Sequence, residues 1–559
     1  MISIRGVSFS YNGSDVPALK NIDLKIERGE FVLLTGESGS GKSSLCRVIN
    51  GLIPHFHGGV ISGHIEVAGL NPLQSSPGLM ANRVGMVFQD PDNQLVTSDV
   101  CHEICFGMEN LAFSRDMIAG RLDESLEMLD IKHLRNRPVA QLSGGEKQRT
   151  AIASVLALRP DILLLDEPTS QLDPAGSQRL LASLRRLNRN LGLTVILVEH
   201  RLEKAIHYAD RLVVMGKGTV LVNQTPRSAM KKSDYALEEC AISLPPVVEL
   251  YRNLVARGVK LDAVPLSLEE GLTVFKKILA APLPDPPEEV GRNNNAVAIE
   301  MEGVSFCYQN QQTILENINL TIKQGEVVAI MGQNASGKTT LLKLINGLLK
   351  PSSGSIKILG TDTSGLSVAE LAATIGVVFQ NPGDHLFSDT VEEEIAFGLK
   401  IRGVAPRDIE AMVGSILSRF NLEPFRARSP NELSLGEKQR LAIASIMVYE
   451  PPVLLLDEPC RGADKSTREN LITILRDHVF RGGTVVMVTH DVELVAEYSQ
   501  RVVIMDSGRI IADGEKREVL PSAGSFSPQI NQLVKLSMGP GASSRLLTAR
   551  EVAGVINES

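Results

Sequence analysis

The sequence carries one glycine-rich pattern twice, 296 positions apart. The first copy, at residues 36–43, reads Gly-Glu-Ser-Gly-Ser-Gly-Lys-Ser and follows the apolar run 31–34. The second copy, at residues 332–339, follows the apolar run 327–330. Each copy is also followed by an apolar-rich stretch, so the pattern predicts a strand, a loop and a helix. That is the context in which a glycine-rich loop binds phosphate.

Each copy has the residue types that phosphate binding requires. Glycines let backbone N–H groups turn inward around phosphate oxygens, and the following helix points its positive end at them. Lys42 and Lys338 supply charge, and the hydroxyls of Ser43 and Thr339 are of the kind that holds Mg²⁺. One Gly/Ser turn could match by accident, but two copies in one context exclude that reading. The predicted residues are Gly36, Glu37, Ser38, Gly39, Ser40, Gly41, Lys42, Ser43 and Ser44, and Gly332, Gln333, Asn334, Ala335, Ser336, Gly337, Lys338, Thr339 and Thr340.

The composition is ordinary for a globular protein. The 559 residues are 43% apolar and 22% charged, and a net charge of −8 gives no basic field for nucleic acid. No stretch offers about 18 uninterrupted apolar residues, and residues 1–5 lack the apolar core of a signal peptide. Six cysteines without a Cys-x-x-Cys pair argue against a disulfide framework or a zinc ribbon. We therefore expect reduced thiols and a cytosolic protein.

The halves repeat as whole domains. Residues 2–11 match residues 299–308, and later landmarks keep an offset of 290 or 291. We predict an α/β fold with two P-loop domains, each followed by a small helical appendix. The predicted segments are a first P-loop domain at 1–233, an appendix at 234–281, a linker at 282–297, a second P-loop domain at 298–520 and a second appendix at 521–559.

Local patterns support the appendix and the linker. Residues 234–281 have helical periodicity, and residues 282–297 are rich in proline and asparagine, as in a stiffened polar linker. The predicted apolar face of the first appendix consists of Val247, Leu250, Leu254 and Val255.

Each half has an apolar run that ends in two carboxylates, Asp166-Glu167 and Asp457-Glu458. An acid at the end of a buried strand, beside a P-loop, is well placed to hold Mg²⁺. The adjacent glutamate can polarise an attacking water. Alone, such a pair could be an ordinary turn. Next to a P-loop in each half, it indicates hydrolytic chemistry.

Residues 142–149 (Leu-Ser-Gly-Gly-Glu-Lys-Gln-Arg) and 433–440 (Leu-Ser-Leu-Gly-Glu-Lys-Gln-Arg) resemble the signature motif of ATP-binding-cassette (ABC) ATPases. The signature serine lies 23 residues before the strand-end aspartate in both halves. P-loop, glutamine, signature, aspartate–glutamate pair and histidine follow the order of this family twice. The resemblance implies a helical signature subdomain in each cassette, ATP and Mg²⁺ as cofactors, and ATP hydrolysis as the activity.

The resemblance also implies a role for each matching residue. The catalytic residues would be Glu167, Glu458, His200 and His490. Tyr11 and Tyr308 would stack on adenine, although strand ends often carry an aromatic residue. The other ATP-binding residues would be Gln89, Gln380, Ser143, Gly144, Gly145, Glu146, Ser434, Leu435, Gly436 and Glu437, with Asp173 and Asp464 in the D-loops. The Mg²⁺ ligands would be Ser43, Gln89, Asp166, Thr339, Gln380 and Asp457.

In this family two cassettes pack head to tail, with the P-loop of one facing the signature of the other. This chain has both cassettes, so the resemblance implies pairing within the chain and no obligate homodimer. We expect two hydrolytic sites. Leu435 in place of a signature glycine, Ala335 in place of a P-loop glycine and the atypical D-loop at 461–464 lead us to expect some asymmetry between them.

Further segments resemble the ATPases of energy-coupling-factor (ECF) transporters. Residues 89–95 and 380–387 are similar to the extended Q-loop of that branch, and 99–107 and 390–398 to the segment that follows it. These acidic segments are also typical of N-capped helix starts. His385 stands where the first half has Gln94, so we expect the two docking grooves to differ.

The ECF resemblance implies a prokaryotic importer ATPase, peripheral on the cytoplasmic face of the cell membrane. Its partners would be an integral membrane T component and a small substrate-binding membrane protein for a vitamin, nickel or cobalt, and no nucleic acid. His55 and His57 could suggest a metal site, but we expect two histidines in a glycine-rich loop to be solvated.

Three alternatives remain open. A sugar-type tandem importer ATPase usually has a degenerate second cassette and a different signature. A soluble tandem ABC ATPase acting on ribosomes or DNA would show a long charged linker, iron–sulfur cysteines or zinc-finger insertions. A module that only binds nucleotide conflicts with the presence of both Glu167 and Glu458.

Overall fold

The computed structural model describes residues 1–13, 16–170, 172–231, 237, 240, 242–280, 283–286, 296–308, 313–539 and 544–556. Two compact units divide the chain: a first unit of Met1–Arg252 with Lys260–Glu270, and a second unit of Asn253–Val259 with Gly271–Ser559. The predicted first appendix contributes to both units. The predicted linker lies largely outside the described residues, and the predicted domain boundaries stay predictions.

The first unit is built on a six-stranded sheet with the order β5-β6-β7-β3-β8-β9. Only the β8–β9 pair is antiparallel. Strands β3, β6 and β7 are buried along their whole length, as expected for parallel strands covered on both faces. The strands are β3 (Phe31–Gly36), β5 (Val84–Val87), β6 (Ile162–Asp166), β7 (Thr194–Val198), β8 (Arg211–Gly216) and β9 (Thr219–Gln224).

A second, antiparallel sheet of the first unit has the order β2-β1-β4. Its strands are β1 (Ile2–Tyr11), β2 (Leu19–Ile26) and β4 (Gly59–Val67). One hydrophobic core joins this sheet to β3 and to α1 (Lys42–Ile49), with Phe9, Leu34 and Leu45 among its members. The P-loop between β3 and α1 is therefore attached to both sheets.

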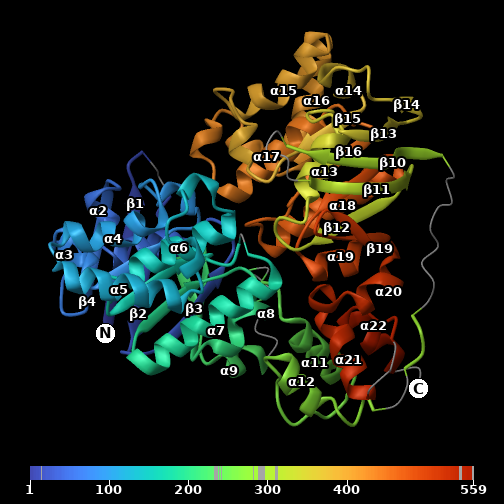
Figure 1. The fold of residues 1–559 in the computed structure, drawn as a ribbon. Helices are drawn as coiled ribbons and strands as arrows, with labels where there is room; N and C mark the ends of the chain where they lie inside the picture. Colours follow the sequence, from blue (N-terminus) through green and yellow to red (C-terminus); the bar gives the residue numbers. More distant parts are fainter. Residues whose placement is uncertain are drawn as a thin grey trace. The chain divides into compact units, whose positions relative to one another are not determined.

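The helices of the first unit follow the chain order seen in Figure 1. They are α1, α2 (Leu52–His55), α3 (Pro77–Ala81), α4 (Val100–Asn110), α5 (Arg115–Met128), α6 (Gly144–Leu156), α7 (Pro174–Leu191), α8 (Leu202–Ala205) and α9 (Pro226–Lys231). Helices α4, α5 and α6 contact one another, and α6 leads from the signature motif to β6.

The second unit repeats this architecture, with the sheet orders β15-β16-β17-β12-β18-β19 and β11-β10-β13-β14. Its strands are β10 (Val297–Cys307), β11 (Thr313–Lys323), β12 (Val327–Gly332), β13 (Ser353–Ile358), β14 (Thr361–Asp362), β15 (Ile375–Val378), β16 (Val453–Asp457), β17 (Thr484–Val488), β18 (Arg501–Asp506) and β19 (Arg509–Glu515). The prediction of two α/β P-loop domains is confirmed.

Within the second unit, α15, α16 and α17 gather at one end of the six-stranded sheet, far from α21 and α22 (Figure 1). The helices are α13 (Lys338–Ile345), α14 (Val368–Leu371), α15 (Val391–Ile401), α16 (Pro406–Arg419), α17 (Leu435–Met447), α18 (Lys465–Phe480), α19 (Val492–Tyr498), α20 (Lys516–Val519), α21 (Gln529–Met538) and α22 (Ala549–Ile556).

Short helices follow each cassette. They are α11 (Pro246–Ala256) and α12 (Leu268–Val274) after the first, and α21 and α22 after the second. Val247, Leu250 and Leu254 of α11 are fully buried, but Val255 is 42% exposed, so its assignment to the apolar face was wrong. Val255 directly follows Leu254, and adjacent helical residues lie about 100° apart around the axis. Across the described residues, none of the helices has the length and apolarity needed to cross a bilayer.

Candidate functional site

The first predicted phosphate-binding loop joins a buried strand to a helix. Strand β3 ends at Gly36, and α1 begins at Lys42 after Gly41, which has a left-handed backbone with φ 99°. No side chain caps this helix, so the N–H groups of its first turn are left for an anion. The second unit has the same arrangement between β12 and α13.

The loop passes very close to a neighbouring strand at Gly36. A Cβ atom there would lie 2.1 Å from the carbonyl oxygen of Met215 on β8. At Gly332 it would lie 2.3 Å from the carbonyl oxygen of Met505 on β18. Glycine at this position is therefore required for the loop to pack onto the sheet.

The loop lysines are buried and fold back over their own loops. Nζ of Lys42 donates to the carbonyl oxygens of Gly36 at 2.9 Å and Glu37 at 2.7 Å. Lys338 makes the same pair of bonds at 2.9 and 2.6 Å. Each lysine is 6% exposed, and its ammonium group places a positive charge inside the loop.

The hydroxyl residue after each lysine contacts the strand-end aspartate. Oγ1 of Thr339 donates to Oδ2 of Asp457 at 2.9 Å, and Ser43 is hydrogen-bonded to Asp166. Burial, with the adjacent glutamate charge, raises the pKa of Asp166 above its usual value and that of Asp457 to about 6. Among the described residues, the buried Oδ1 of Asp166 has no hydrogen-bond partner. This set of hard oxygen donors, with one acceptor left over, fits Mg²⁺.

Glu167 of the first unit is held by two side chains. Nε2 of Gln89 donates to its Oε2 at 2.9 Å, and Nε2 of His200 lies 3.0 Å from its Oε1. Burial raises the pKa of Glu167, but the nearby His200 and Lys42 outweigh burial and bring that pKa below its usual value. The structure therefore brings the predicted residues Gln89 and His200 into contact with the buried Glu167, with the charge of Lys42 nearby.

Glu458 of the second unit has different partners. Thr489 Oγ1 donates to its Oε2 at 3.2 Å, and His490 Nε2 lies 3.6 Å from its Oε1, beyond hydrogen-bond distance. Burial raises the pKa of Glu458 to about 7. Gln380 is exposed, and within the described part of the chain no hydrogen bond joins it to Glu458. The two glutamates are thus in unequal electrostatic environments.

Both glutamates have a left-handed backbone, with φ 49° at Glu167 and φ 52° at Glu458. Their amides donate to the carbonyl oxygens of Val198 at 3.1 Å and Val488 at 2.8 Å on the next strand. This conformation costs a residue with a Cβ about 1–2 kcal/mol. Such strain is concentrated at functional sites, where the surrounding structure maintains it.

The two predicted adenine-stacking tyrosines lie at or just after the ends of β1 and β10. The Tyr11 hydroxyl lies 2.9 Å from Ser44 Oγ, and Arg47 Nη1 donates to it at 3.4 Å. Tyr308 is 45% exposed. Each ring packs edge-on against a phenylalanine two residues earlier, at 4.7 and 4.8 Å between centroids.

Ser143 and Ser434 of the signatures are the N-caps of α6 and α17, and both are exposed. Each serine makes a reciprocal capping box with the glutamate three residues later. Leu435 occupies the first helical position of α17, where α6 has Gly144. The signature therefore presents the N-terminus of a helix at the surface.

The D-loop aspartates are also N-caps. Oδ1 of Asp173 accepts from the Gly176 amide at 2.6 Å before α7, and Oδ1 of Asp464 accepts from the Thr467 amide at 2.9 Å before α18. Their role across a cassette interface stays a prediction.

Sequence reasoning missed a buried acid beside the first site. Glu199 precedes His200, and Thr169 Oγ1 donates to its Oε1 at 2.6 Å. Burial raises the pKa of Glu199 to about 6. The second half has Cys460 in place of Thr169 and Thr489 in place of Glu199. This difference within otherwise matching motifs is the sequence signal that could have revealed the pair.

Sequence reasoning also missed the anchors of the segment after each predicted Q-loop glutamine. Glu394 is buried, and its Oε2 accepts from the amides of Phe387 and Ser388 at 2.9 and 2.8 Å. Glu103 makes the equivalent pair of bonds in the first unit. The predicted N-capped helix starts are confirmed, because Asp99 caps α4 and Thr390 caps α15.

His385 accepts the same backbone hydrogen bond as its counterpart Gln94. Its Nε2 accepts from the Phe379 amide at 2.8 Å, as Oε1 of Gln94 accepts from the Phe88 amide at 3.0 Å. Burial lowers the pKa of His385.

Throughout the described ranges, no group of three or more His, Cys, Asp or Glu residues is placed to hold a metal ion. None of the six cysteines forms a disulfide in the part of the chain that the structure describes. His55 is exposed, with Nε2 at 3.1 Å from the Pro72 carbonyl oxygen.

Comparison with known proteins gives a consistent result. The chain is 39% identical to an inferred ABC transporter ATP-binding protein of Methanosarcina acetivorans, over 93% of this chain and 85% of that protein. It is 37% identical to another inferred ABC transporter ATP-binding protein, from Caldanaerobacter subterraneus, over 96% of this chain and 94% of that protein. Among solved structures it matches cbiO1 of Clostridium perfringens, part of the ABC transporter complex cbiONQ. That match has 33% identity, covers 43% of this chain and 99% of that chain, and has a TM-score of 0.39.

The family model described as "ABC transporter" matches residues 19–170 and 315–461, which contain the P-loops, the signatures and the strand-end carboxylates of both halves. The same segments contain the loop lysines, the strand-end carboxylates and the predicted Q-loop glutamines of the two sites described above, whereas His200 and His490 lie outside them. The chain therefore belongs to the ABC transporter family, as an ABC ATPase with two cassettes in one polypeptide.

Proposed function

We propose that this chain is the energy-coupling ATPase of a membrane importer of the ECF type, with a vitamin or a transition-metal ion as cargo. The observation that carries the proposal is an apolar surface beside the Q-loop segment of the second unit, formed by Phe387, Phe397 and Ile401. These side chains are 64%, 41% and 70% exposed. Clustered exposed apolar side chains are typical of sites that bind another protein or a membrane.

The apolar surface is held in place from within. The rings of Phe387 and Phe397 pack edge-to-face at 4.6 Å, and the buried Glu394 fixes the Phe387 amide. The first unit has exposed Val96 and Phe106 at the matching positions, 67% and 46% exposed. A helix of a membrane T component is a suitable occupant, because its apolar face would cover these residues.

At each nucleotide site we assign roles to the chain's own residues. Lys42 and Lys338 bind the β- and γ-phosphates, and Glu167 and Glu458 act as general bases that polarise the attacking water. His200 and His490 would hold the γ-phosphate region, and His200, at 3.0 Å from Glu167, would also orient that base. Mg²⁺ would be held by Ser43 and Asp166 in the first site and by Thr339 and Asp457 in the second. Gln89 and Gln380 would complete the ligand sets of these two Mg²⁺ sites. The ion would offset the negative charge of the phosphates.

We further propose that the cassettes pair within the chain, each P-loop facing the signature of the other cassette. The exposed helix N-termini at Ser143 and Ser434 support this, because such an N-terminus binds an anion well. The expected species is a monomer that closes on two ATP molecules. Light scattering with ATP on a double Glu167→Gln, Glu458→Gln protein tests it: an ATP-dependent dimer of chains would contradict pairing within the chain.

Purification from native cells in mild detergent tests the importer assignment. We expect an integral membrane T component and a small membrane protein to accompany the chain, and the ligand of the small protein to identify the cargo. Recovery with ribosomes or nucleic acid and without a membrane partner would overturn the assignment, while leaving the ATPase intact.

A charge placed in the apolar surface tests the docking site. Phe387→Asp is expected to abolish recovery of the membrane partner, because a carboxylate must be desolvated to enter an apolar contact. Ile511→Asp is the matched control, since Ile511 of β19 is 63% exposed in the same unit and lies outside the proposed surface. The proposal would be contradicted if both variants lost the membrane partner equally, or if both still recovered it.

The base assignment has a separate test. ATP turnover should fall at least about 100-fold in the double Glu167→Gln, Glu458→Gln variant, because general-base catalysis contributes that much or more. Binding of a fluorescent ATP analogue should persist. Unchanged turnover in the double variant would refute the role of both glutamates.

A further inference from the structure

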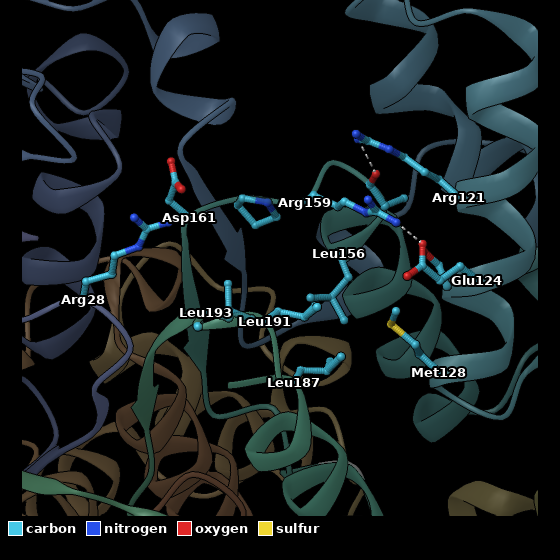
Figure 2. Close-up of a pocket in the computed structure, with 14 residues that line it drawn as sticks. Arg28, Arg121, Glu124, Met128, Leu156, Arg159, Asp161, Leu187, Leu191 and Leu193 are labelled. Carbon is cyan, nitrogen blue, oxygen red and sulfur yellow. Dashed lines mark hydrogen bonds and ion pairs between the residues drawn. The ribbon is translucent and has the colours of Figure 1, made fainter. Parts of the chain in front are cut away.

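A cavity of about 300 Å³ lies in the first unit, at the end of β6 opposite Asp166 (Figure 2). Its lining comes from α5, from the C-terminal end of α6 with the loop that follows, and from the end of α7. It is separate from the nucleotide site, which lies at the carboxyl end of the same strand. The volume is at the lower end of the range for pockets that hold small organic molecules.

One side of the cavity is apolar. Leu156, Leu187 and Leu193 are 9%, 6% and 6% exposed, and Met128 of α5 completes this wall. Leu191 stands at the opening and is 62% exposed. Figure 2 shows Leu187, Leu191 and Leu193 below Arg159 and Asp161. An apolar ligand body would be removed from water here at about 25 cal/mol for each Å² buried.

The other side of the cavity carries three guanidinium groups, those of Arg28, Arg121 and Arg159, and two carboxylates. Arg159 pairs with Glu124 at 2.6 Å. Asp161 pairs at 2.9 Å with Arg83, which is not part of the lining. The lining is therefore left with an excess of positive charge.

The arginines keep capacity for a ligand. Arg121 Nη1 donates to the carbonyl oxygens of Ala157 and Leu158 at 3.1 and 3.3 Å, which fixes its position at the end of α6. Burial and the positive charge of Arg159 lower the pKa of Arg121. Arg28 is exposed, and among the described residues it has no ion pair. An anion between these groups would relieve the repulsion between Arg121 and Arg159.

The second unit provides an internal comparison. Gln324 stands where the first unit has Arg28, because each directly precedes the glycine that follows the matching strand. Met412 occupies the position of Arg121 in the matching helix, and Glu450 the position of Arg159, which has the same left-handed backbone. At the position of Leu187 it has His478, which is buried and whose ring lies against Gly483. All three arginines are thus particular to the first cassette. A general requirement of the fold would have kept them in both.

We propose that this cavity is a binding site for a small organic anion with an apolar body, such as an alkyl carboxylate or an alkyl phosphate. Its head group would lie among Arg28, Arg121 and Arg159, and its body against the leucine wall. The bound anion would bridge α5, α7 and the end of α6. Because the signature serine Ser143 is the N-cap of α6, such a ligand would influence the position of the signature through this helix. This inference concerns the first cassette alone and does not depend on the importer proposal.

The chain has no tryptophan, so a single introduced one reports on this cavity alone. In the full-length Leu191→Trp protein, decanoate and octyl phosphate are expected to change the fluorescence saturably. Inorganic phosphate and the neutral octyl glucoside are expected to leave it unchanged at the same concentrations. Comparing the two anions tells a carboxylate ligand from a phosphate one. Calorimetric titration of the unaltered chain checks that the tryptophan itself did not create the site.

Two variants test the arginines with residues that the second cassette already tolerates. Arg121→Met and Arg159→Glu, each combined with Leu191→Trp, should weaken binding of the alkyl anion at least tenfold. Arg509→Gln, which alters an exposed arginine of the second unit, is the control and should leave binding unchanged. Equal binding of octyl glucoside, binding that survives both arginine changes, or absence of binding in both measurements would overturn the proposal.

Discussion

The imidazole Nε2 of His200 lies 3.0 Å from the carboxylate Oε1 of Glu167, and both side chains are about nine-tenths buried. In the second cassette the matching atoms of His490 and Glu458 are 3.6 Å apart. The same sequence pattern has therefore produced a histidine–glutamate hydrogen-bond distance in one site and a longer contact in the other. The difference in stability that this implies is large enough to measure.

His200→Ala should destabilise the protein by about 2 kcal/mol more than His490→Ala does, because the 3.0 Å contact of His200 with the Glu167 carboxylate is within hydrogen-bond distance and the 3.6 Å contact of His490 with Glu458 is not. Each change leaves the same imidazole-sized space, so subtracting the two effects isolates the pair. Denaturant unfolding of both variants measures it. Equal losses would show that the shorter distance contributes no stability.

Ala335→Gly should raise stability by about 0.5 kcal/mol. Ala335 has φ 63°, a region where a Cβ costs about 1–2 kcal/mol, and the greater freedom of glycine in the unfolded chain offsets part of the gain. The reverse change, Gly39→Ala, should cost a similar amount, since Gly39 has φ 75° and a Cβ there would meet nothing within 4 Å.

Gly36→Ala should lower stability much more than Gly39→Ala does. At Gly36 the added Cβ would lie 2.1 Å from the Met215 carbonyl oxygen, whereas at Gly39 it would meet nothing within 4 Å. Thermal unfolding of the three variants orders them. A gain in stability for Gly39→Ala would contradict the strain argument.

Stability should fall between pH 7.5 and pH 5.5 more in the wild-type chain than in His385→Gln. Burial lowers the pKa of His385 below its ordinary 6.5, despite the opposing charges of Asp384 and Glu394. As the pH falls, the unfolded chain binds the proton first, so the contribution of His385 is present above pH 6.5 and is lost below it. Glutamine accepts the Phe379 bond at any pH, as Gln94 does in the first cassette.

Denaturant unfolding at the two pH values tests this, with Gln94→His as the complementary variant. That change should introduce the same pH dependence into the first cassette. A pH dependence that does not differ between wild type and His385→Gln would refute it.

Thr169→Val should cost about 1–3 kcal/mol, because the buried Glu199 loses its 2.6 Å hydrogen bond. The double change Thr169→Cys, Glu199→Thr reproduces the residues of the second cassette and should recover most of the loss. A double-mutant cycle gives the coupling between the two residues. A coupling near zero would mean that Lys204, which donates to Thr169 Oγ1 at 3.3 Å, is the more important partner.

Features set by local sequence could be predicted. The P-loops, the carboxylate-terminated strands and the capped helices α4 and α15 each depend on a few consecutive residues, and all lie where the sequence indicated. The repeat then made the two-domain fold predictable, because every local pattern occurs in both halves.

Features set by distance through space could not be predicted. Glu199 and Thr169 are thirty residues apart and meet only because β7 lies beside β6. The unequal pKa values of Glu167 and Glu458 depend on a 0.6 Å difference in histidine distance and on whether Gln89 or Gln380 reaches the carboxylate. The arginine-lined cavity needs α5, α6 and α7 in their folded positions before its charges come together.

At Glu167 and Glu458 the left-handed backbone makes the requirements of stability and of the proposed base role conflict. Glycine there would relieve about 1 kcal/mol of strain and would remove the carboxylate at the same time. Selection for heat resistance alone would therefore favour loss of the proposed general base at this position. Thermostable relatives that keep the glutamate must gain their stability elsewhere in the fold.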